Sequence, residues 1–358
     1  MPTPELLFGW DVGGAHVKIA RLERGAGGAL LLRDAMQWPC ALWLGLDRLQ
    51  QTIAAAQQRW PDLHHAEHAM TMSGEMVDLF PDRAAGVQAI VQSMRAALAG
   101  APLHCWAGEQ RWLRAAEAPA AWAGIASANW LASAELAARV VGNGLLVDIG
   151  STTTDLVPLR AGRAAARGRS DAQRLHSGEL LYLGVARTPL MALAPRVPFA
   201  GALHNVMNEY FATTADVYRL TGELDPQHDQ HPPADNGPKD LRATRQRLAR
   251  MVGRDAADGS DADWLALAQY WRQCQVDTTL AELQRVAGAA GLPGDAPLVA
   301  AGCGDFLVSE LGAAGGRPVL SLAERCLPLH PAAGAEVARW AQVGAPAAAV
   351  ALLRERSD

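Results

Sequence analysis

Short apolar runs alternate with amphipathic stretches along the first part of the chain. The runs at Leu6–Asp11 and Val17–Arg21 are joined by a Gly-rich turn and predict a β-hairpin. Apolar residues at helical spacing follow, with glycine or proline near their ends. The other elements expected here are strands at 29–36, 68–73 and 103–106, and helices at 46–59, 83–98 and 129–141.

The second part of the chain opens in the same way. The nearly continuous apolar run Gly144–Ile149 predicts a buried strand, and Leu156–Arg160 leaves the next turn as its partner. Residues 221–240 are rich in Pro, Gly, Asp and His and predict a long surface loop. The remaining elements expected are strands near 179–185, 297–301 and 319–322, and helices at 207–220, 241–252, 263–286, 306–312, 332–343 and 345–354.

Strands that alternate with helices predict an α/β architecture of layered sheets. Gly142-Asn143-Gly144 closes the helix expected at 129–141 and is the preferred boundary between lobes. We therefore expect a first lobe at 1–142 and a second lobe at 143–330. The C-terminal helices at 331–358 are expected to pack back on the first lobe.

Composition narrows the class of protein without naming it. The chain has 358 residues, of which 50% are hydrophobic and 19% charged, as in soluble globular proteins. A net charge of −5 offers no basic field for nucleic acid or an anionic membrane. We find no apolar run of the ~18 residues that a membrane span requires and no signal-peptide pattern, so a cytoplasmic protein is expected. The oligomeric state stays open, a homo-oligomer included.

Two segments repeat one device, GWDVGGAHVK at Gly9–Lys18 and LLVDIGSTTTDL at Leu145–Leu156. Asp11 and Asp148 each end an apolar run and precede a Gly-rich turn. A carboxylate at a strand end suits a hydrated Mg²⁺, and glycines let backbone N–H groups approach phosphate oxygens. Either segment alone could be a plain hairpin turn, but the repeated layout favours two facing turns that hold a polyphosphate and its cation. The phosphate-binding candidates are Gly13, Gly14, Ala15, His16, Gly150, Ser151, Thr152, Thr153 and Thr154.

Lys18 is unusual because only two of the 32 basic residues in the chain are lysines. It follows the first turn, where a compact ammonium would meet a bound anion. A third candidate for anion binding is LVAAGCGDFL at Leu298–Leu307. This segment predicts a strand, a Gly-x-Gly turn and the start of a helix, and Gly302 and Gly304 are its anion-binding positions. Asp305 has two readings, a site carboxylate or an N-cap.

Weaker candidates lie in the first lobe. Glu75 follows a predicted strand and is either a general base or a turn carboxylate. Ser127, Asn129 and Glu135 lie before or on the helix at 129–141 and would line a cleft. We find no P-loop, zinc-protease or nucleophile-elbow motif, which argues against those enzyme classes.

Two Asp-Gly hairpins and a later Gly-rich turn resemble the phosphate-1, phosphate-2 and adenosine motifs of the actin–sugar kinase–Hsp70 superfamily. The resemblance implies two ribonuclease H-like lobes around a central cleft. Within it, DVGGAHVK, TMSGEM, ASANW, VDIGSTTTDL, NEYFATTADVYRLTGEL and RLARMVGRD resemble the hydantoinase/oxoprolinase-like family of tetrahydromethanopterin-linked one-carbon pathways. Archaeal members are assigned as the methanofuran-biosynthesis synthase that makes the furan–tyramine ether.

The family resemblance implies a condensation. An aminomethylfuran methyl diphosphate would alkylate the phenol of a γ-glutamyltyramine-like amine and release diphosphate. Relatives usually carry Thr and Asp where this chain has Ala15 and Lys18, and Gly-Gly where it has Gly302-Cys303-Gly304. Those departures weaken ATP use and leave a diphosphate site intact.

In the resulting hypothesis, Asp11 and Asp148 hold Mg²⁺ and Lys18 neutralises the leaving group. Glu75, or Asp155 as second choice, takes the phenol proton. Two alternatives stay open. One is an ATP-dependent small-molecule kinase or amide hydrolase of the same fold, and the other is a non-catalytic metabolite- or nucleotide-binding protein.

Overall fold

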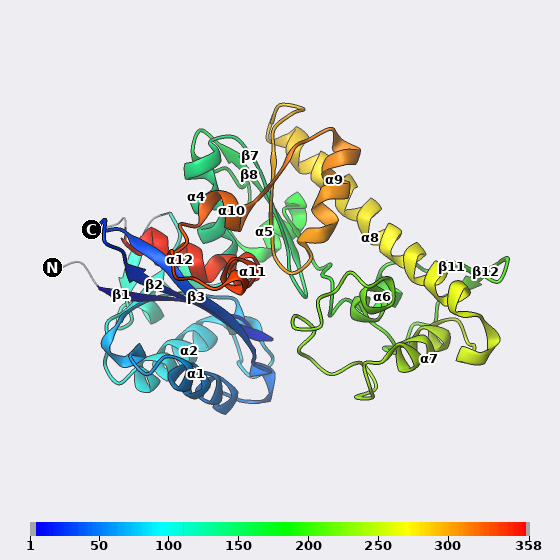
Figure 1. Ribbon diagram of the computed structural model, residues 1–358, viewed down its shortest axis with the longest axis horizontal. Coiled ribbons are helices and arrows are strands. Elements are labelled where there is room, and N and C mark those ends of the chain that lie inside the picture. The colour runs from blue at the N-terminus through cyan, green and yellow to red at the C-terminus, as the bar shows by residue number, and fades with distance from the viewer. Residues whose placement is uncertain (1–4, 110, 356–358) are drawn as a thin grey trace. The chain divides into compact units, whose positions relative to one another are not determined.

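The computed structural model describes residues 5–109 and 111–355, and they form two units (Figure 1). The first unit contains the described residues of Met1–Gly142, Leu159–Ala164 and Ser321–Asp358. The second contains Asn143–Pro158 and Ala165–Leu320. The helices of the described residues include none with the length and apolar character needed to cross a membrane.

The first unit is built on a six-stranded sheet with the order β3-β2-β1-β4-β5-β6. β1 pairs antiparallel with β2 and parallel with β4. The strands are β1 (Leu6–Val12), β2 (His16–Arg24), β3 (Leu30–Pro39), β4 (Glu67–Met72), β5 (Leu103–Trp106) and β6 (Trp112–Arg114). The helices are α1 (Asp47–Arg59), α2 (Arg83–Ala97), α3 (Trp122–Ile125), α4 (Asn129–Val141), α10 (Leu322–Cys326), α11 (Ala335–Val343) and α12 (Ala345–Glu355).

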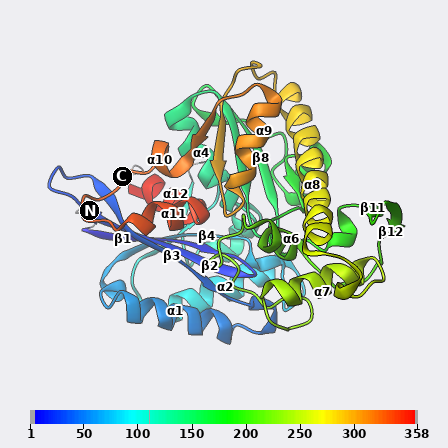
Figure 2. The same ribbon diagram turned by 45° about the vertical axis from the view of Figure 1, so that its right-hand side comes forward.

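The two faces of this sheet are covered by different helices. Phe8 and Trp10 of β1 point into a buried apolar cluster that includes Ile53 of α1 and Ile90 of α2. α12 packs against β1 and β4, and α11 packs against β3. Figure 2 shows α1 and α2 on one side of the sheet and the red helices α11 and α12 on the other. The C-terminal helices are thus part of the core of the first unit, because their alanine-rich faces allow close packing on the strands.

The second unit repeats this arrangement with the strand order β10-β8-β7-β13-β14. β9 (Arg163–Ala164) pairs with Leu159 and Arg160 at the end of β8, within the segment that belongs to the first unit. Its strands are β7 (Gly144–Ile149), β8 (Thr154–Arg160), β10 (Leu180–Leu181), β13 (Leu298–Ala301) and β14 (Val319–Ser321). A separate hairpin consists of β11 (Arg196–Phe199) and β12 (Ala202–Asn205). The helices are α5 (Asp171–Ser177), α6 (Thr214–Thr221), α7 (Leu241–Met251), α8 (Asp261–Ala289) and α9 (Val308–Gly315).

The helix predicted at 207–220 is shorter in the structure. α6 begins at Thr214, because Thr213 caps it: the Asp216 side chain accepts a hydrogen bond from the Thr213 N–H (3.1 Å). Residues 208–211 of that stretch form bends, and Thr213 forms an isolated β-bridge with Pro189. The sequence pattern also missed short elements that show no clear period, namely β6, β9, β11, β12, α3, α5 and α10.

The segment 221–240, predicted as a surface loop, forms ion pairs with neighbouring helices. Arg247 of α7 and Asp216 of α6 are both fully buried, with Nε and Oδ1 2.7 Å apart. Arg247 also binds Asp235 of the loop (3.1 Å), and Arg219 binds Asp229 of the loop (2.7 Å). Arg219 and Arg247 therefore bind acidic residues of this segment. Composition alone does not predict these ion pairs, because the arginines lie outside the segment.

His68 of β4 makes the stability of the first unit dependent on pH. The Trp10 Nε1–H donates to His68 Nδ1 (3.0 Å), and His68 Nε2 lies 3.1 Å from the Leu63 carbonyl oxygen. Burial lowers the pKa of His68 from 6.5 to about 4. The folded protein therefore holds this ring neutral at pH values where the unfolded chain is already protonated.

We expect the free energy of unfolding to be unaffected by His68 above pH 6.5 and to fall between pH 6.5 and about 4. The full loss is about 3 kcal/mol, since each unit of pKa difference corresponds to about 1.4 kcal/mol. Urea denaturation at a series of pH values measures it. His68→Gln keeps an acceptor for Trp10 but does not titrate, so its curve should be flatter. Parallel curves for the two proteins would refute the assignment.

Candidate functional site

The first Asp-Gly turn connects β1 to β2. Asp11, one residue before the end of β1, is fully buried, and the Lys18 Nζ–H donates to its Oδ2 at 3.0 Å. Asp11 Oδ1 is buried and accepts no hydrogen bond from the described residues. The Gly13 N–H donates to the His16 carbonyl (2.9 Å) and closes the turn. The turn thus presents a carboxylate oxygen and an ammonium group at the carboxyl end of β1.

Glu75 lies at the carboxyl end of β4, the parallel neighbour of β1. Its side chain is 1% exposed, and the Ser127 hydroxyl donates to Glu75 Oε1 at 2.8 Å. Ser127 itself has a φ of +49°, a left-handed conformation that is unfavourable for a serine. Such strain persists only where the surrounding structure imposes it, and it often marks a functional residue. A buried carboxylate with a positioned hydroxyl is a suitable proton acceptor.

The second Asp-Gly turn connects β7 to β8. Asp148 is one residue before the end of β7 and is half-buried. The Gly150 N–H donates to the Thr153 carbonyl (2.8 Å), and the hydroxyls of Ser151 and Thr152 lie 3.4 Å apart. Among the described residues, the N–H groups of Ser151, Thr152 and Thr153 find no acceptor. Consecutive N–H groups of this kind make an anion-binding concavity.

The two turns are alike in their hydrogen bonds. In each, the N–H of the glycine two residues after the Asp donates to the carbonyl three residues further on. In each unit, the loop after the neighbouring parallel strand also forms a hydrogen bond with the residue that follows the Asp. The Ser73 N–H, after β4, donates to the Val12 carbonyl (3.1 Å), and the Gly304 N–H, after β13, donates to the Ile149 carbonyl (2.8 Å). The repeat therefore includes the segment after β4 and the segment after β13, which sequence comparison of the two hairpins alone missed.

Gly302 lets the loop after β13 approach Asp148. Its φ is +86°, and a Cβ built there would lie 2.5 Å from Asp148 Oδ1 and collide with the Ile149 carbonyl. We expect Gly302→Ala to lower the free energy of unfolding by about 2 kcal/mol or more, through backbone strain and displacement of Asp148. Urea denaturation measures the loss. Gly294→Ala is the control, since a Cβ there meets no atom within 4 Å. Equal stability of the two variants would contradict this close approach.

Some predicted site residues are held in structural contacts. Asp155 of β8 binds the buried Arg174 of α5, with Oδ1 and Nη2 2.7 Å apart. The Thr154 hydroxyl donates to the Leu183 carbonyl (2.6 Å). Asp305 is the first residue of a short 3₁₀ helix whose N-cap is Gly304, so the N-cap reading of Asp305 is wrong.

The other predicted residues lie at or near the turns. The carbonyls of Gly14 and Ala15 accept hydrogen bonds from Leu42 N–H (3.0 Å) and Cys40 N–H (2.8 Å). His16 is buried as the first residue of β2. Asn129 is the half-buried first residue of α4, and Glu135 is buried on the same helix. The carbonyl groups of Gly14 and Ala15 thus serve the fold, since they bind the segment that follows β3.

Arg187 contacts the second turn, although it lies outside the sequence motif that forms this turn. The Arg187 Nη1–H donates to Thr152 Oγ1 at 3.4 Å, and the Arg187 N–H donates to the Ser151 carbonyl (2.8 Å). Burial lowers the pKa of Arg187 from its usual value, while the phenols of Tyr210 and Tyr182 act in the opposite direction. No spacing or pattern in the sequence connects this residue to the turn.

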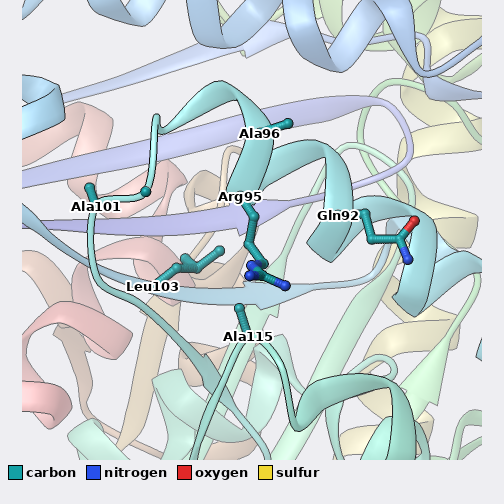
Figure 3. Close-up of a pocket in the computed structure, with 7 residues that line it drawn as sticks. Gln92, Arg95, Ala96, Ala101, Leu103 and Ala115 are labelled. Carbon is teal, nitrogen blue, oxygen red and sulfur yellow. The ribbon is translucent and has the colours of Figure 1, made fainter.

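A pocket in the first unit lies away from the predicted residues. Figure 3 shows Arg95 and Gln92 of α2 beside Leu103 and Ala115. The complete lining is Gln92, Arg95, Ala96, Gly100, Ala101, Leu103 and Ala115. It contains one charged side chain and none of the residues of the two turns, so we do not assign the candidate site to it.

Two sheets of related strand order, each with an Asp-Gly turn at the carboxyl end of its first strand, define the class of the protein. It has the α/β fold of the actin–sugar kinase–Hsp70 superfamily, with two ribonuclease H-like lobes. A solved structure of this kind is nucleotide-free acetone carboxylase, with a TM-score of 0.52, 9% identity, and coverage of 86% of this chain and 68% of that one. At this identity the likeness concerns the fold alone.

Residues 67–322 match the hydantoinase/oxoprolinase family, and the chain belongs to that family. Two archaeal relatives carry the name (4-{4-[2-(gamma-L-glutamylamino)ethyl]phenoxymethyl}furan-2-yl)methanamine synthase. The protein from Methanocaldococcus jannaschii is 28% identical over 251 residues, 70% of this chain and 72% of the relative. The protein from Methanococcus vannielii is 31% identical over 187 residues, 51% of this chain and 82% of the relative.

Proposed function

We propose that the protein is an enzyme that forms the furan–phenol ether of a methanofuran or methylofuran coenzyme. The observation that carries this proposal is the match over 70% of the chain to a synthase whose name describes a phenoxymethylfuran amine. Each turn supports it separately, because the N–H groups and hydroxyls of the 150–153 turn and the ammonium group of Lys18 after the first turn are suited to phosphate oxygens. The substrates would be an aminomethylfuran methyl diphosphate and a γ-glutamyltyramine-like phenol.

The reaction is a substitution at the furfuryl carbon. The bond between this carbon and the diphosphate oxygen breaks, and the electron pair leaves with diphosphate. The phenol oxygen bonds to the same carbon and loses its proton, which Glu75 accepts. The furan ring stabilises positive charge on that carbon, so the main task of the protein is to stabilise negative charge on the leaving group. Lys18 and the N–H groups of the turns do this.

The chemistry of the site fits Mg²⁺, which takes one or two carboxylates and keeps water or phosphate oxygens as its other ligands. Asp11 has a buried oxygen that accepts no hydrogen bond from the described residues, and Asp148 occupies the equivalent strand position. Within the described residues there is no cluster of three or more metal-binding side chains. We propose Asp11 as the carboxylate for such an ion in the first unit and Asp148 as the carboxylate in the second unit. The ion would supply neutralising charge for the diphosphate.

The experiment is to incubate the purified protein with the furan diphosphate, γ-glutamyltyramine and Mg²⁺, and to measure the ether by mass spectrometry and the released diphosphate. One diphosphate per ether is expected. The matched control is the γ-glutamyl amide of phenethylamine, which lacks the phenol oxygen and should give no condensation product. A parallel incubation replaces the diphosphate with ATP. Saturable ATP turnover without ether formation would favour a kinase or amide hydrolase instead and overturn the proposal.

A further inference from the structure

The loop that follows β10 lies directly on the second Asp-Gly turn. The Val185 N–H donates to the Gly150 carbonyl (3.0 Å), and the Ala186 and Arg187 N–H groups donate to the Ser151 carbonyl (3.1 and 2.8 Å). A Cβ at Gly184 would collide with the backbone of Ser151 and Thr152, so glycine is needed for this approach. The turn and the loop are therefore one rigid element of the second unit.

The loop is held in place from its other side as well. The Gly184 N–H donates to Thr188 Oγ1 (2.8 Å), and the Gly184 carbonyl accepts from Thr214 Oγ1 (2.9 Å) and from the amide of Gln275 (3.3 Å). Gln275 in turn accepts a hydrogen bond from the buried Tyr218 hydroxyl (3.0 Å). Helices α6 and α8 thus fix the position from which the Arg187 side chain starts.

The Arg187 side chain contacts the same turn that carries the consecutive N–H groups. The carbonyls of Gly150 and Ser151 are used by the loop, whereas the N–H groups of Ser151, Thr152 and Thr153 donate to no acceptor among the described residues. The Arg187 guanidinium reaches the Thr152 hydroxyl at 3.4 Å. A guanidinium beside consecutive N–H groups matches the fork geometry by which arginine binds phosphate oxygens.

We propose that Arg187 binds a phosphate oxygen of the substrate's diphosphate at the 150–153 turn. The inference rests on the proposed function for the identity of the substrate, and on the geometry of the second unit for the location. Arg187 would then be the positively charged side chain of the second turn, as Lys18 is that of the first turn. Arg187 would hold the diphosphate both before and after the carbon–oxygen bond breaks.

The test measures inorganic diphosphate binding by calorimetry in the presence of Mg²⁺, with the full chain. Arg187→Met keeps an unbranched apolar stem and removes the charged guanidinium, and should weaken binding about tenfold or more. Arg187→Lys keeps the charge without the planar fork and should give an intermediate loss. Arg242→Ala is the matched control, an exposed arginine on α7 that should bind as the wild type. Thermal unfolding checks that each variant is folded.

The two proposals fail in different ways. If Arg187→Met binds diphosphate as tightly as the wild type while the wild type makes the ether, the role of Arg187 is overturned and the proposed function stands. If the wild type makes no ether but binds diphosphate and Arg187→Met does not, Arg187 keeps its role and the condensation is wrong. A wild type that does not bind diphosphate overturns the assignment of Arg187.

Discussion

Lys18→Met is expected to lower kcat by about 10²–10³, because the variant loses the charge that, in the proposed reaction, stabilises the departing diphosphate. Lys18 Nζ lies 3.0 Å from a buried carboxylate oxygen of Asp11, so its ammonium is held in one place at the end of β1. Steady-state kinetics of diphosphate release measure the effect. Lys18→Arg keeps the charge but brings a larger planar group, and should recover part of the activity.

The same substitution leaves Asp11 buried without its cation. We expect a loss of about 1–2 kcal/mol in the free energy of unfolding, a moderate value because Lys18 is 23% exposed. Lys239→Met is a matched control, since the second lysine of the chain is also paired with an aspartate, Asp229 (3.2 Å). It should change stability but not kcat. Wild-type turnover in Lys18→Met would remove Lys18 from the mechanism.

Glu75→Gln is expected to lower kcat by about 10²–10⁴, the usual contribution of a general base. The amide oxygen still accepts the hydrogen bond of the Ser127 hydroxyl, which is 2.8 Å from Glu75 Oε1. The Tm of the variant should therefore stay close to that of the wild type, and the loss of turnover can be attributed to the missing proton acceptor. If kcat is unchanged while the Tm shifts, Glu75 is a structural carboxylate.

Ser127 provides a further control as the residue that positions Glu75. Ser127→Gly removes the hydroxyl and tolerates the φ of +49°, whereas Ser127→Ala removes the hydroxyl and keeps the strain. The glycine variant should keep KM and lose part of kcat, because the Glu75 carboxylate is no longer held in one position by the Ser127 hydroxyl. A kcat identical to that of the wild type would mean that Ser127 has only a packing role.

Much of the fold could be predicted from the sequence because the strands of both units are apolar runs with glycine at their ends. The helix at 129–141 and the strand at 144–149 have the predicted bounds, and most other elements differ by a few residues. The exceptions were short elements and α6, whose start is set by a capping interaction of Thr213 and not by apolar spacing. Periodicity needs several residues to become visible, and two- or four-residue strands do not provide them.

Asp11, Lys18 and Asp148 could be selected from the sequence because each turn is local: the residues that form it are consecutive, and glycine, aspartate and threonine restrict its conformation. By contrast, only the tertiary structure brought Ser127 to Glu75, Gly302 to Asp148 and Arg187 to Thr152. The members of each of these pairs are dozens of positions or more apart in the chain. Their contact depends on which strands lie side by side and on the path of the loops that follow them, and neither is set by local preference.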